Sequence, residues 1–225
     1  MIGGARGLGR EAARRLVAAG HTVYIGARDV TRGREAADQL GAKFLQLDVT
    51  DDESVAAAAG RLTELDVLVN CAGAFEGMLE PEDATAGHMR ESFDVNVSGV
   101  VRTIHAFLPV LRGSGVPVIV NVSSGLGSFG TVNNPERHES RFPLPVYASS
   151  KAAVGMLTVQ YAKGLPGIRV NAVDPGCTGT EMHGTSGDGI QTAEEGTDAI
   201  VRRLASIGAN GPAGTFSDRH GELPW

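Results

Sequence analysis

The sequence contains few of the residues that build metal centres, disulfide scaffolds or membrane spans. Only two of its 225 residues are cysteines, Cys71 and Cys177, and neither has the spacing of a zinc ligand pair. The six histidines form no HxH or HExxH pattern, so we expect no metal site. No apolar run approaches the roughly 18 residues needed to cross a bilayer. We therefore expect two reduced thiols in a cytoplasmic protein with no membrane partner.

Positive charge is also scarce. The chain has 20 Lys and Arg against 26 Asp and Glu, for a net charge of −6, and the basic residues are spread along it. This distribution argues against a nucleic-acid partner, which would need a basic face. The first residues have neither the basic nor the apolar stretch of a secretory signal. Because no repeat or linker divides the sequence, we expect residues 1–225 to form a single domain.

Short β-branched runs alternate with longer amphipathic runs along the chain. Several short runs are apolar at consecutive positions, which is typical of strands covered on both faces. The expected strands are 21–27, 42–47, 66–70, 116–123, 168–173 and 213–216, and the expected helices are 10–19, 31–40, 51–62, 86–111, 146–163 and 193–206. This alternation predicts an α/β fold with a doubly wound, Rossmann-like parallel sheet in three α/β/α layers. Ligands then bind at the carboxyl ends of the strands.

A glycine-rich turn begins at Gly3, with only two residues before it. Such turns normally follow a strand, which in this fold lies in the centre of the sheet. We therefore expect the first strand to be missing or truncated in this sequence, and the natural chain to begin about 5–8 residues upstream, given the mean strand length.

Two of the candidate motifs concern phosphate and ribose recognition. The glycines of the turn at residues 3–9 permit close backbone approach, and the helix that follows attracts a phosphate to its N-terminus. Arg6, Arg28 and Arg32 are candidates for gripping the 2′-phosphate of NADP, whereas Asp29 is an alternative partner for the free hydroxyl of NAD. A plain glycine turn and a solvated charge cluster at a helix start remain the structural alternatives.

Two further motifs concern proton transfer. Tyr147 and Lys151 share one helix face at i, i+4, and a nearby ammonium lowers the pKa of a phenol toward working pH. Ser123 and Ser124 end an apolar strand, which places a hydroxyl at the cleft. Each motif alone also fits a structural role, as a helix surface pair or a strand-ending turn.

In their order along the chain, these motifs resemble the short-chain dehydrogenase/reductase family. The matching segments are Gly3-Gly4-Ala5-Arg6-Gly7-Leu8-Gly9, Leu47-Asp48-Val49, Asn70-Cys71-Ala72-Gly73, Val95-Asn96-Val97, Ser123-Ser124, Tyr147-x-x-x-Lys151 and Asp174-Pro175-Gly176 with Thr180. Within the family, residues 26–33 and the tail 211–225 are similar to the NADPH-dependent carbonyl reductases. The resemblance spans essentially the whole chain.

The resemblance implies a role for each matching residue. Tyr147 would be the acid/base, Lys151 would hold the nicotinamide ribose and lower the pKa of Tyr147, and Ser124, rather than Ser123, would polarise the carbonyl. Asn96 would keep a bend in the long helix and help a water relay. The cofactor would be NADPH rather than NADH, bound by Tyr147 and Lys151 together with Gly3, Arg6, Gly7, Leu8, Gly9, Arg28, Arg32, Asp48, Val49, Asn70, Ala72, Gly73, Pro175, Gly176, Thr178 and Thr180.

The implied function is NADPH-dependent reduction of a ketone or aldehyde to an alcohol, or the reverse, with transfer of the pro-S hydride. A non-catalytic NADP-binding sensor on the same fold is the alternative from another class, and the presence of all four implied catalytic residues argues against it. A double-bond reductase or an epimerase is a second alternative. These enzymes usually have another Tyr/Lys spacing or a larger substrate domain, and the sequence has neither.

Two segments depart from the family pattern. The extra residues 131–145 resemble an insertion of some carbonyl reductases, near the active site and the dimerisation helix, which argues against the tetramer typical of the family. Monomer, homodimer and homotetramer all remain open. The segment 180–193 is short and Gly-rich, so we expect a small substrate lid. The candidates for the substrate pocket are Phe75, Met78, His138, Met182, His183 and Trp225.

Overall fold

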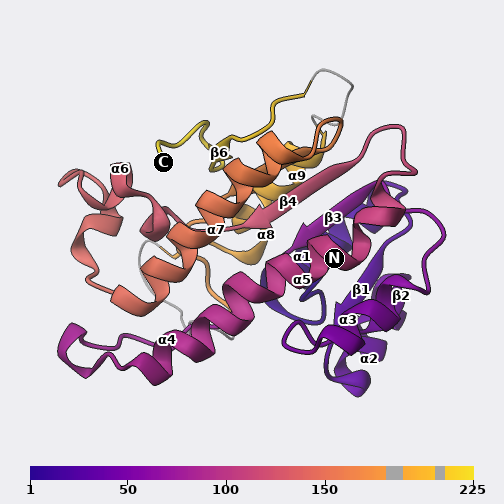
Figure 1. Ribbon diagram of the computed structural model, residues 1–225, viewed down its shortest axis with the longest axis horizontal. Helices are drawn as coiled ribbons and strands as arrows, with labels where there is room; N and C mark the ends of the chain where they lie inside the picture. The colour runs from indigo at the N-terminus through magenta and orange to yellow at the C-terminus, as the bar shows by residue number, and fades with distance from the viewer. Residues whose placement is uncertain (181–189, 206–210) are drawn as a thin grey trace.

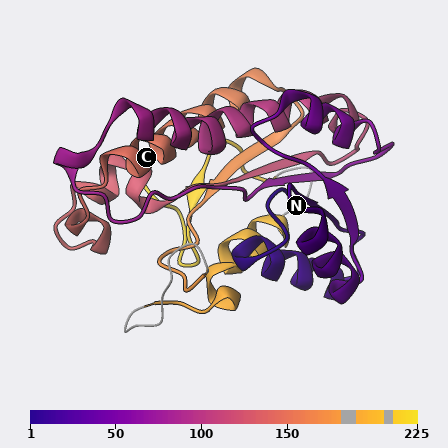
Figure 2. The ribbon, with the colours of Figure 1, turned by 90° about the horizontal axis from the view of Figure 1, so that it is seen from below.

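A parallel sheet between two layers of helices forms the frame of the computed structural model, which describes residues 1–180, 190–205 and 211–225 (Figure 1, Figure 2). The strands are β1 (Tyr24–Ala27), β2 (Lys43–Gln46), β3 (Val67–Asn70), β4 (Val118–Val122), β5 (Arg169–Val173) and β6 (Phe216–Ser217). The helices are α1 (Gly7–Ala18), α2 (Val30–Leu40), α3 (Asp52–Ala59), α4 (Ala86–Phe93), α5 (Gly99–Leu111), α6 (Phe129–Val132), α7 (Pro145–Gly164), α8 (Ala193–Gly196) and α9 (Asp198–Ala205). The Rossmann-like fold expected from the alternation is confirmed.

The sheet has a two-stranded part, β1–β2, and a four-stranded part in the order β3–β4–β5–β6. Ile2 connects the two parts, because it forms parallel bridges to both Gly26 and Asn70. Its N–H donates to the Val69 carbonyl oxygen at 2.9 Å, and its own carbonyl oxygen accepts from Cys71 N–H at 3.0 Å. The first strand of the described chain is thus reduced to one bridging residue, as the position of the glycine turn predicted.

The continuous apolar runs of the central strands are buried on both faces. In β4, Ile119 packs into one cluster with α3, α5 and α7, while Val118 and Val120 pack into another with α1 and α9. Figure 2 shows the same division, with α5 and α7 on one side of the sheet and α1 with α9 on the other. Consecutive side chains of a strand point to opposite faces, so a run of valines and isoleucines requires helices on both.

Local sequence signals set most helix ends. Asp29 caps α2 by accepting a hydrogen bond from Arg32 N–H, and Gly41 ends that helix in the left-handed conformation at φ 69°. Asp51 caps α3 in the same way, through the N–H groups of Glu53 and Ser54. Within residues 1–180, 190–205 and 211–225, no helix is both long and apolar enough to cross a membrane.

The long helix predicted over 86–111 is interrupted. Five residues, Asp94–Ser98, form a π-helical turn between α4 and α5. Asn96 lies within this turn and is 2% exposed, with its amide directed at the loop after β3. Such π turns are often found at functional sites, where they reorient a side chain that a regular helix would direct elsewhere.

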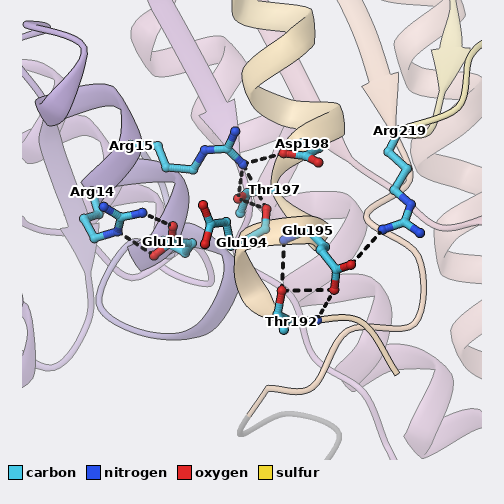
Figure 3. Close-up of polar contacts among 9 residues, drawn as sticks. All are labelled: Glu11, Arg14, Arg15, Thr192, Glu194, Glu195, Thr197, Asp198 and Arg219. Atoms are coloured by element: carbon cyan, nitrogen blue, oxygen red, sulfur yellow. Dashed lines mark hydrogen bonds and ion pairs between the residues drawn. The ribbon is translucent and has the colours of Figure 1, made fainter. Parts of the chain in front are cut away.

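The helix predicted over 193–206 is divided at Thr197 into α8 and α9. Figure 3 shows how Arg15 of α1 holds this junction. Its Nη1 donates to the Glu194 carbonyl oxygen, Thr197 Oγ1 and Asp198 Oδ1, at 2.9, 3.0 and 2.7 Å. One guanidinium therefore fixes the α8–α9 turn against the helix that begins at the glycine-rich turn.

We expect Arg15→Met to lower the free energy of unfolding by about 1–3 kcal/mol, because the variant loses three hydrogen bonds of a charged group. Arg14→Met is the matched control, since within the described residues Arg14 pairs only with Glu11, in an exposed i, i+3 pair, and its loss should change stability by less than about 1 kcal/mol. Urea unfolding of the two variants measures the difference. Equal losses would contradict this role of Arg15.

Candidate active site

The candidate active site lies among the loops that follow β1, β3, β4 and β5, at the carboxyl ends of the strands. A cleft of about 750 Å³ opens there. It collects most of the residues predicted to bind a cofactor or take part in chemistry: Gly3, Arg6, Gly7, Leu8, Gly9, Arg28, Arg32, Asp48, Val49, Ala72, Gly73, Ser124, Tyr147, Lys151, Pro175, Gly176 and Thr180. Residues far apart in the sequence thus meet where a parallel α/β sheet binds its ligands.

The glycine-rich turn is packed so tightly that side chains would not fit at Gly3 and Gly9. Gly3 has φ 80°, and a Cβ there would lie 2.6 Å from the Ala72 backbone nitrogen. Gly9 packs directly on the Gly3 carbonyl group, so the turn folds tightly onto the start of α1. The side chain of the N-cap residue Arg6 does not cap α1, and no acidic residue lies in its first turn. The backbone and the helix N-terminus therefore face the cleft, as a phosphate site requires.

Three of the four candidates for the ribose end, Arg28, Asp29 and Arg32, have different surroundings. The Asp29 carboxylate caps α2, and the Arg32 guanidinium lies 3.8 Å from it. Arg28 is exposed, lines the cleft, and helps to lower the pKa of Asp48, although a hydrogen bond from Thr50 N–H is the larger cause of that shift. Because the Asp29 carboxylate already caps α2, Arg28 is the side chain best placed to contact a ligand at this end of the cleft.

Tyr147 and Lys151 come from the first two turns of α7 and are both buried. The Ser124 side chain lies near the Tyr147 phenol and acts to lower its pKa. The Lys151 Nζ donates to the Val122 carbonyl oxygen at 3.0 Å and lies 5.6 Å from the centre of the Tyr147 ring. The edge of Phe75 packs on the same ring, with centroids 5.1 Å apart. The three polar groups thus converge at one end of the cleft.

The pKa of Tyr147 differs from the expectation that Lys151 lowers it. Burial raises the pKa of Tyr147, the nearby Asp174 and Glu76 carboxylates raise it further, and the Ser124 side chain only partly opposes them. Burial also lowers the pKa of Lys151 to about 8. The i, i+4 spacing predicted that Tyr147 and Lys151 lie together, but it could not predict their burial. Burial is the largest influence on the pKa of each residue. The phenol consequently holds its proton firmly.

Asn96 fastens the loop after β3. Its Oδ1 accepts from Ala74 N–H at 2.7 Å, and its Nδ2 donates to the Ala74 carbonyl oxygen at 3.0 Å and to Ser150 Oγ at 3.0 Å. The bend expected at Asn96 is present as the π turn. Asn96 does not line the cleft, so it acts by holding the Ala74 loop and α7 together.

Two predicted cofactor residues lie outside the cleft. Asn70 is 4% exposed and bonds to Asn121 Oδ1 at 2.9 Å, with Thr103 Oγ1 donating to it. Thr178 is 2% exposed, and its hydroxyl bonds to the Pro175 and Gly176 carbonyl oxygens. The prediction for both residues is therefore corrected: they do not line the cleft, and they support the neighbouring loops. Their side chains are buried in the interior, which their place in a motif does not reveal.

Four of the six candidates for the substrate pocket lie among the described residues. Phe75, Met78 and His138 line the cleft, whereas Trp225 stacks on Phe216 with centroids 5.4 Å apart. Met182 and His183 lie outside the described residues. Ser123 is 4% exposed and donates to the Lys151 carbonyl oxygen, which suits a structural serine. In the part of the chain that the structure describes, no cluster of His, Cys, Asp or Glu could hold a metal.

Two acidic residues of the site had no predicted role. Asp174 follows β5 directly and is 5% exposed, and Glu139 belongs to the inserted segment, where Arg137 Nη2 binds it at 2.7 Å. Both line the cleft. A charged residue immediately after an apolar strand was the sequence signal available for Asp174, because that position faces the ligand edge of the sheet.

Known proteins resemble this chain in sequence and in fold. Residues 1–191 match the family model described as short chain dehydrogenase. The short-chain dehydrogenase anuI of Penicillium roqueforti (strain FM164) is 35% identical over 219 residues, covering 90% of this chain and 86% of that protein. Salutaridine reductase of Papaver bracteatum is 31% identical, covering 97% of this chain and 93% of that protein.

A solved structure is also similar to this chain in its three-dimensional fold. The NADPH-bound carbonyl reductase from chicken fatty liver superposes with a TM-score of 0.88 at 26% sequence identity. The superposition covers 100% of this chain and 97% of that one. Sequence and fold therefore lead to the same group of proteins.

Proposed function

The chain belongs to the short-chain dehydrogenase family, and we propose that it is an NADPH-dependent carbonyl reductase, which converts a ketone or aldehyde to an alcohol or runs the reverse reaction. The family uses nicotinamide cofactors to interconvert carbonyls and alcohols. One observation carries the finer proposal: Ser124, Tyr147 and Lys151 meet at one end of a cleft whose other end is a glycine cradle beside exposed arginines.

The residues of the cleft fit a dinucleotide. The turn at Gly3 and Gly9 and the N-terminus of α1 would hold the diphosphate, because these glycines line the cleft without side chains and no side chain caps the helix. Asp48 and Val49 would contact adenine, while Ala72 and Gly73 would line the middle of the cleft. Lys151 would bind the nicotinamide ribose, near Pro175, Gly176 and Thr180. Bound NADPH would supply the hydride that the carbonyl carbon receives.

The side chains supply position and a proton. Ser124 would donate a hydrogen bond to the carbonyl oxygen and so polarise it. Tyr147 would then transfer its phenolic proton to that oxygen as the new C–H bond forms, which completes the alcohol. The raised pKa of Tyr147 keeps the phenol protonated before the reaction, as a proton donor requires. Lys151, with a pKa lowered to about 8, remains largely cationic at neutral pH and stabilises the phenolate that is left.

Cofactor choice is tested by Arg28→Asp. We expect the ratio of kcat/KM for NADPH to that for NADH to fall about tenfold or more, because a charged hydrogen bond to the 2′-phosphate is worth roughly 1.5–3 kcal/mol. Arg34→Asp is the matched control, since Arg34 is exposed on the adjoining helix α2 and does not line the cleft. An unchanged ratio in Arg28→Asp would count against this assignment.

The reaction itself is tested with a panel of ketones and aldehydes, followed by the loss of NADPH absorbance. We expect consumption of NADPH with at least one class of carbonyl compound. Tight NADPH binding with no turnover across the panel would instead support the non-catalytic sensor.

A further inference from the structure

The turn after β5, residues 174–180, is bound from outside by Gln191, which lies just before α8. Gln191 N–H donates to the Cys177 carbonyl oxygen at 2.9 Å, and the Gln191 carbonyl oxygen accepts from Gly179 N–H at 2.9 Å. These bonds form a parallel bridge between Thr178 and Gln191. Gln191 does not line the cleft, but four residues of the turn do: Pro175, Gly176, Cys177 and Thr180. Gln191 therefore supports a wall of the cleft without lining it.

The side chain of Gln191 packs directly on Gly176. Gly176 has φ 70°, and a Cβ on it would overlap Gln191 Nε2 and lie 3.4 Å from Gln191 Cδ. The Gly176 N–H donates to Asp174 Oδ1 at 2.9 Å, and its carbonyl oxygen accepts from Thr178 Oγ1 at 3.2 Å. The polar groups of Gly176 are thus held within the turn, while the Gln191 amide covers the position that a side chain would occupy.

The amide oxygen of Gln191 adds no hydrogen bond to this contact. Its Oε1 is buried, and within residues 1–180, 190–205 and 211–225 it has no hydrogen-bond partner. A buried polar atom without a partner lowers the stability of a fold, so the oxygen itself gives no reason for a glutamine here. The role that the structure does show for the side chain is its packing on Gly176.

The chain that follows Gln191 is fixed by the polar contacts drawn in Figure 3. Thr192 is the N-cap of α8, and its N–H donates to Glu195 Oε2 at 2.9 Å. Arg219 Nη1 donates to Glu195 Oε1 at 3.4 Å, and Arg15 binds the other end of α8. Gln191 therefore presses on the turn from a firmly held base.

We propose that Gln191 is a positioning residue for the nicotinamide half of the cofactor, which acts by keeping the Gly176 turn in the shape that this half requires. The inference rests on the proposed function, in which Pro175, Gly176 and Thr180 lie near the nicotinamide. The phosphate cradle belongs to a different turn, residues 3–9. Loss of the Gln191 side chain should therefore affect only ligands that carry the nicotinamide.

The proposal is tested with two ligands, NADPH and adenosine 2′,5′-bisphosphate, which lacks the nicotinamide half. Each is titrated by calorimetry into the unmodified protein and into Gln191→Ala, which keeps the backbone bonds to the turn. We expect Gln191→Ala to raise the Kd for NADPH about tenfold, as it would if the turn kept the required shape in about a tenth of the molecules. The Kd for adenosine 2′,5′-bisphosphate should stay the same.

Two further variants separate packing from other effects. Gln191→Met keeps an unbranched side chain over Gly176 and removes an amide oxygen that has no partner, so it should bind NADPH as the unmodified protein does. Gln160→Ala is the matched control, since Gln160 is exposed on α7 and does not line the cleft. It should bind both ligands normally.

An unchanged Kd for NADPH in Gln191→Ala, equal weakening of both ligands in that variant, or an equal loss in Gln191→Met would overturn the proposal. If Gln191→Ala fails to fold, Gln191→Asn takes its place, because asparagine keeps a polar side chain that is one methylene shorter. The same difference between the two ligands is expected there. Failure of both ligands to bind the unmodified protein would contradict the proposed function, on which this inference rests.

Discussion

Replacing Tyr147 with Phe is expected to lower kcat for carbonyl reduction by about 10²–10⁴-fold, because general acid catalysis of this kind contributes that much. The substitution removes only the phenolic oxygen. The ring keeps its edge contact with Phe75 and its place in α7, so the fold and the affinity for NADPH should be preserved. Turnover is measured by NADPH absorbance, and affinity by titration of NADPH fluorescence.

Tyr161→Phe provides the matched control for this loss. Tyr161 lies on the same helix but packs against the core rather than lining the cleft. Loss of its hydroxyl should leave kcat within about twofold, since Tyr161 does not line the cleft where the reaction would take place. Full activity in Tyr147→Phe, or equal losses in both variants, would show that the phenol of Tyr147 is not the proton donor.

Replacing Gly9 with Ala is expected to abolish measurable NADPH binding and to destabilise the protein by about 1–3 kcal/mol, the usual cost of forcing an extra carbon into a packed site. The new Cβ would overlap the Gly3 carbonyl oxygen, and it would lie 2.9 Å from the Gly3 carbonyl carbon and 3.2 Å from Gly4 Cα. These are backbone atoms, so relief requires the whole turn to move. That turn is the proposed phosphate cradle.

Gly60→Ala is the control for Gly9→Ala. Gly60 ends α3 with helical angles, and a Cβ there would meet the Ala56 carbonyl oxygen at an ordinary 3.5 Å. This variant should bind NADPH normally and unfold within about 1 kcal/mol of the parent, because alanine fits the native backbone. Calorimetry and NADPH titration compare the two. Normal cofactor binding by Gly9→Ala would contradict the assignment of the cradle.

Local patterns were sufficient to predict much of the frame. The apolar run of β4 predicted a strand covered on both faces, and Gly41 predicted the end of α2, because both signals depend on neighbouring residues only. The position of the glycine turn likewise predicted a shortened first strand, which the structure reduces to Ile2. These features follow from backbone geometry and periodicity.

Features that depend on long-range contacts could not be predicted in the same way. The break at Thr197 follows from contacts with Arg15, which is distant in sequence. The inward turn of Asn70 depends on Thr103 and Asn121. The pKa of Tyr147 is raised mainly because the phenol is buried, and burial is a property of the whole fold. Motif spacing identified which residues meet, and packing determined what each of them does there.

The most direct test of the proposed reaction uses NADPH that carries deuterium at the pro-S position of C4. The protein, the labelled cofactor and a reactive ketone or aldehyde are incubated together, and the alcohol is analysed by mass spectrometry. We expect one deuterium on the former carbonyl carbon of the product, because the hydride comes from the cofactor while Tyr147 supplies the proton on oxygen. An alcohol without deuterium, or no alcohol from any carbonyl compound tested, would contradict the account.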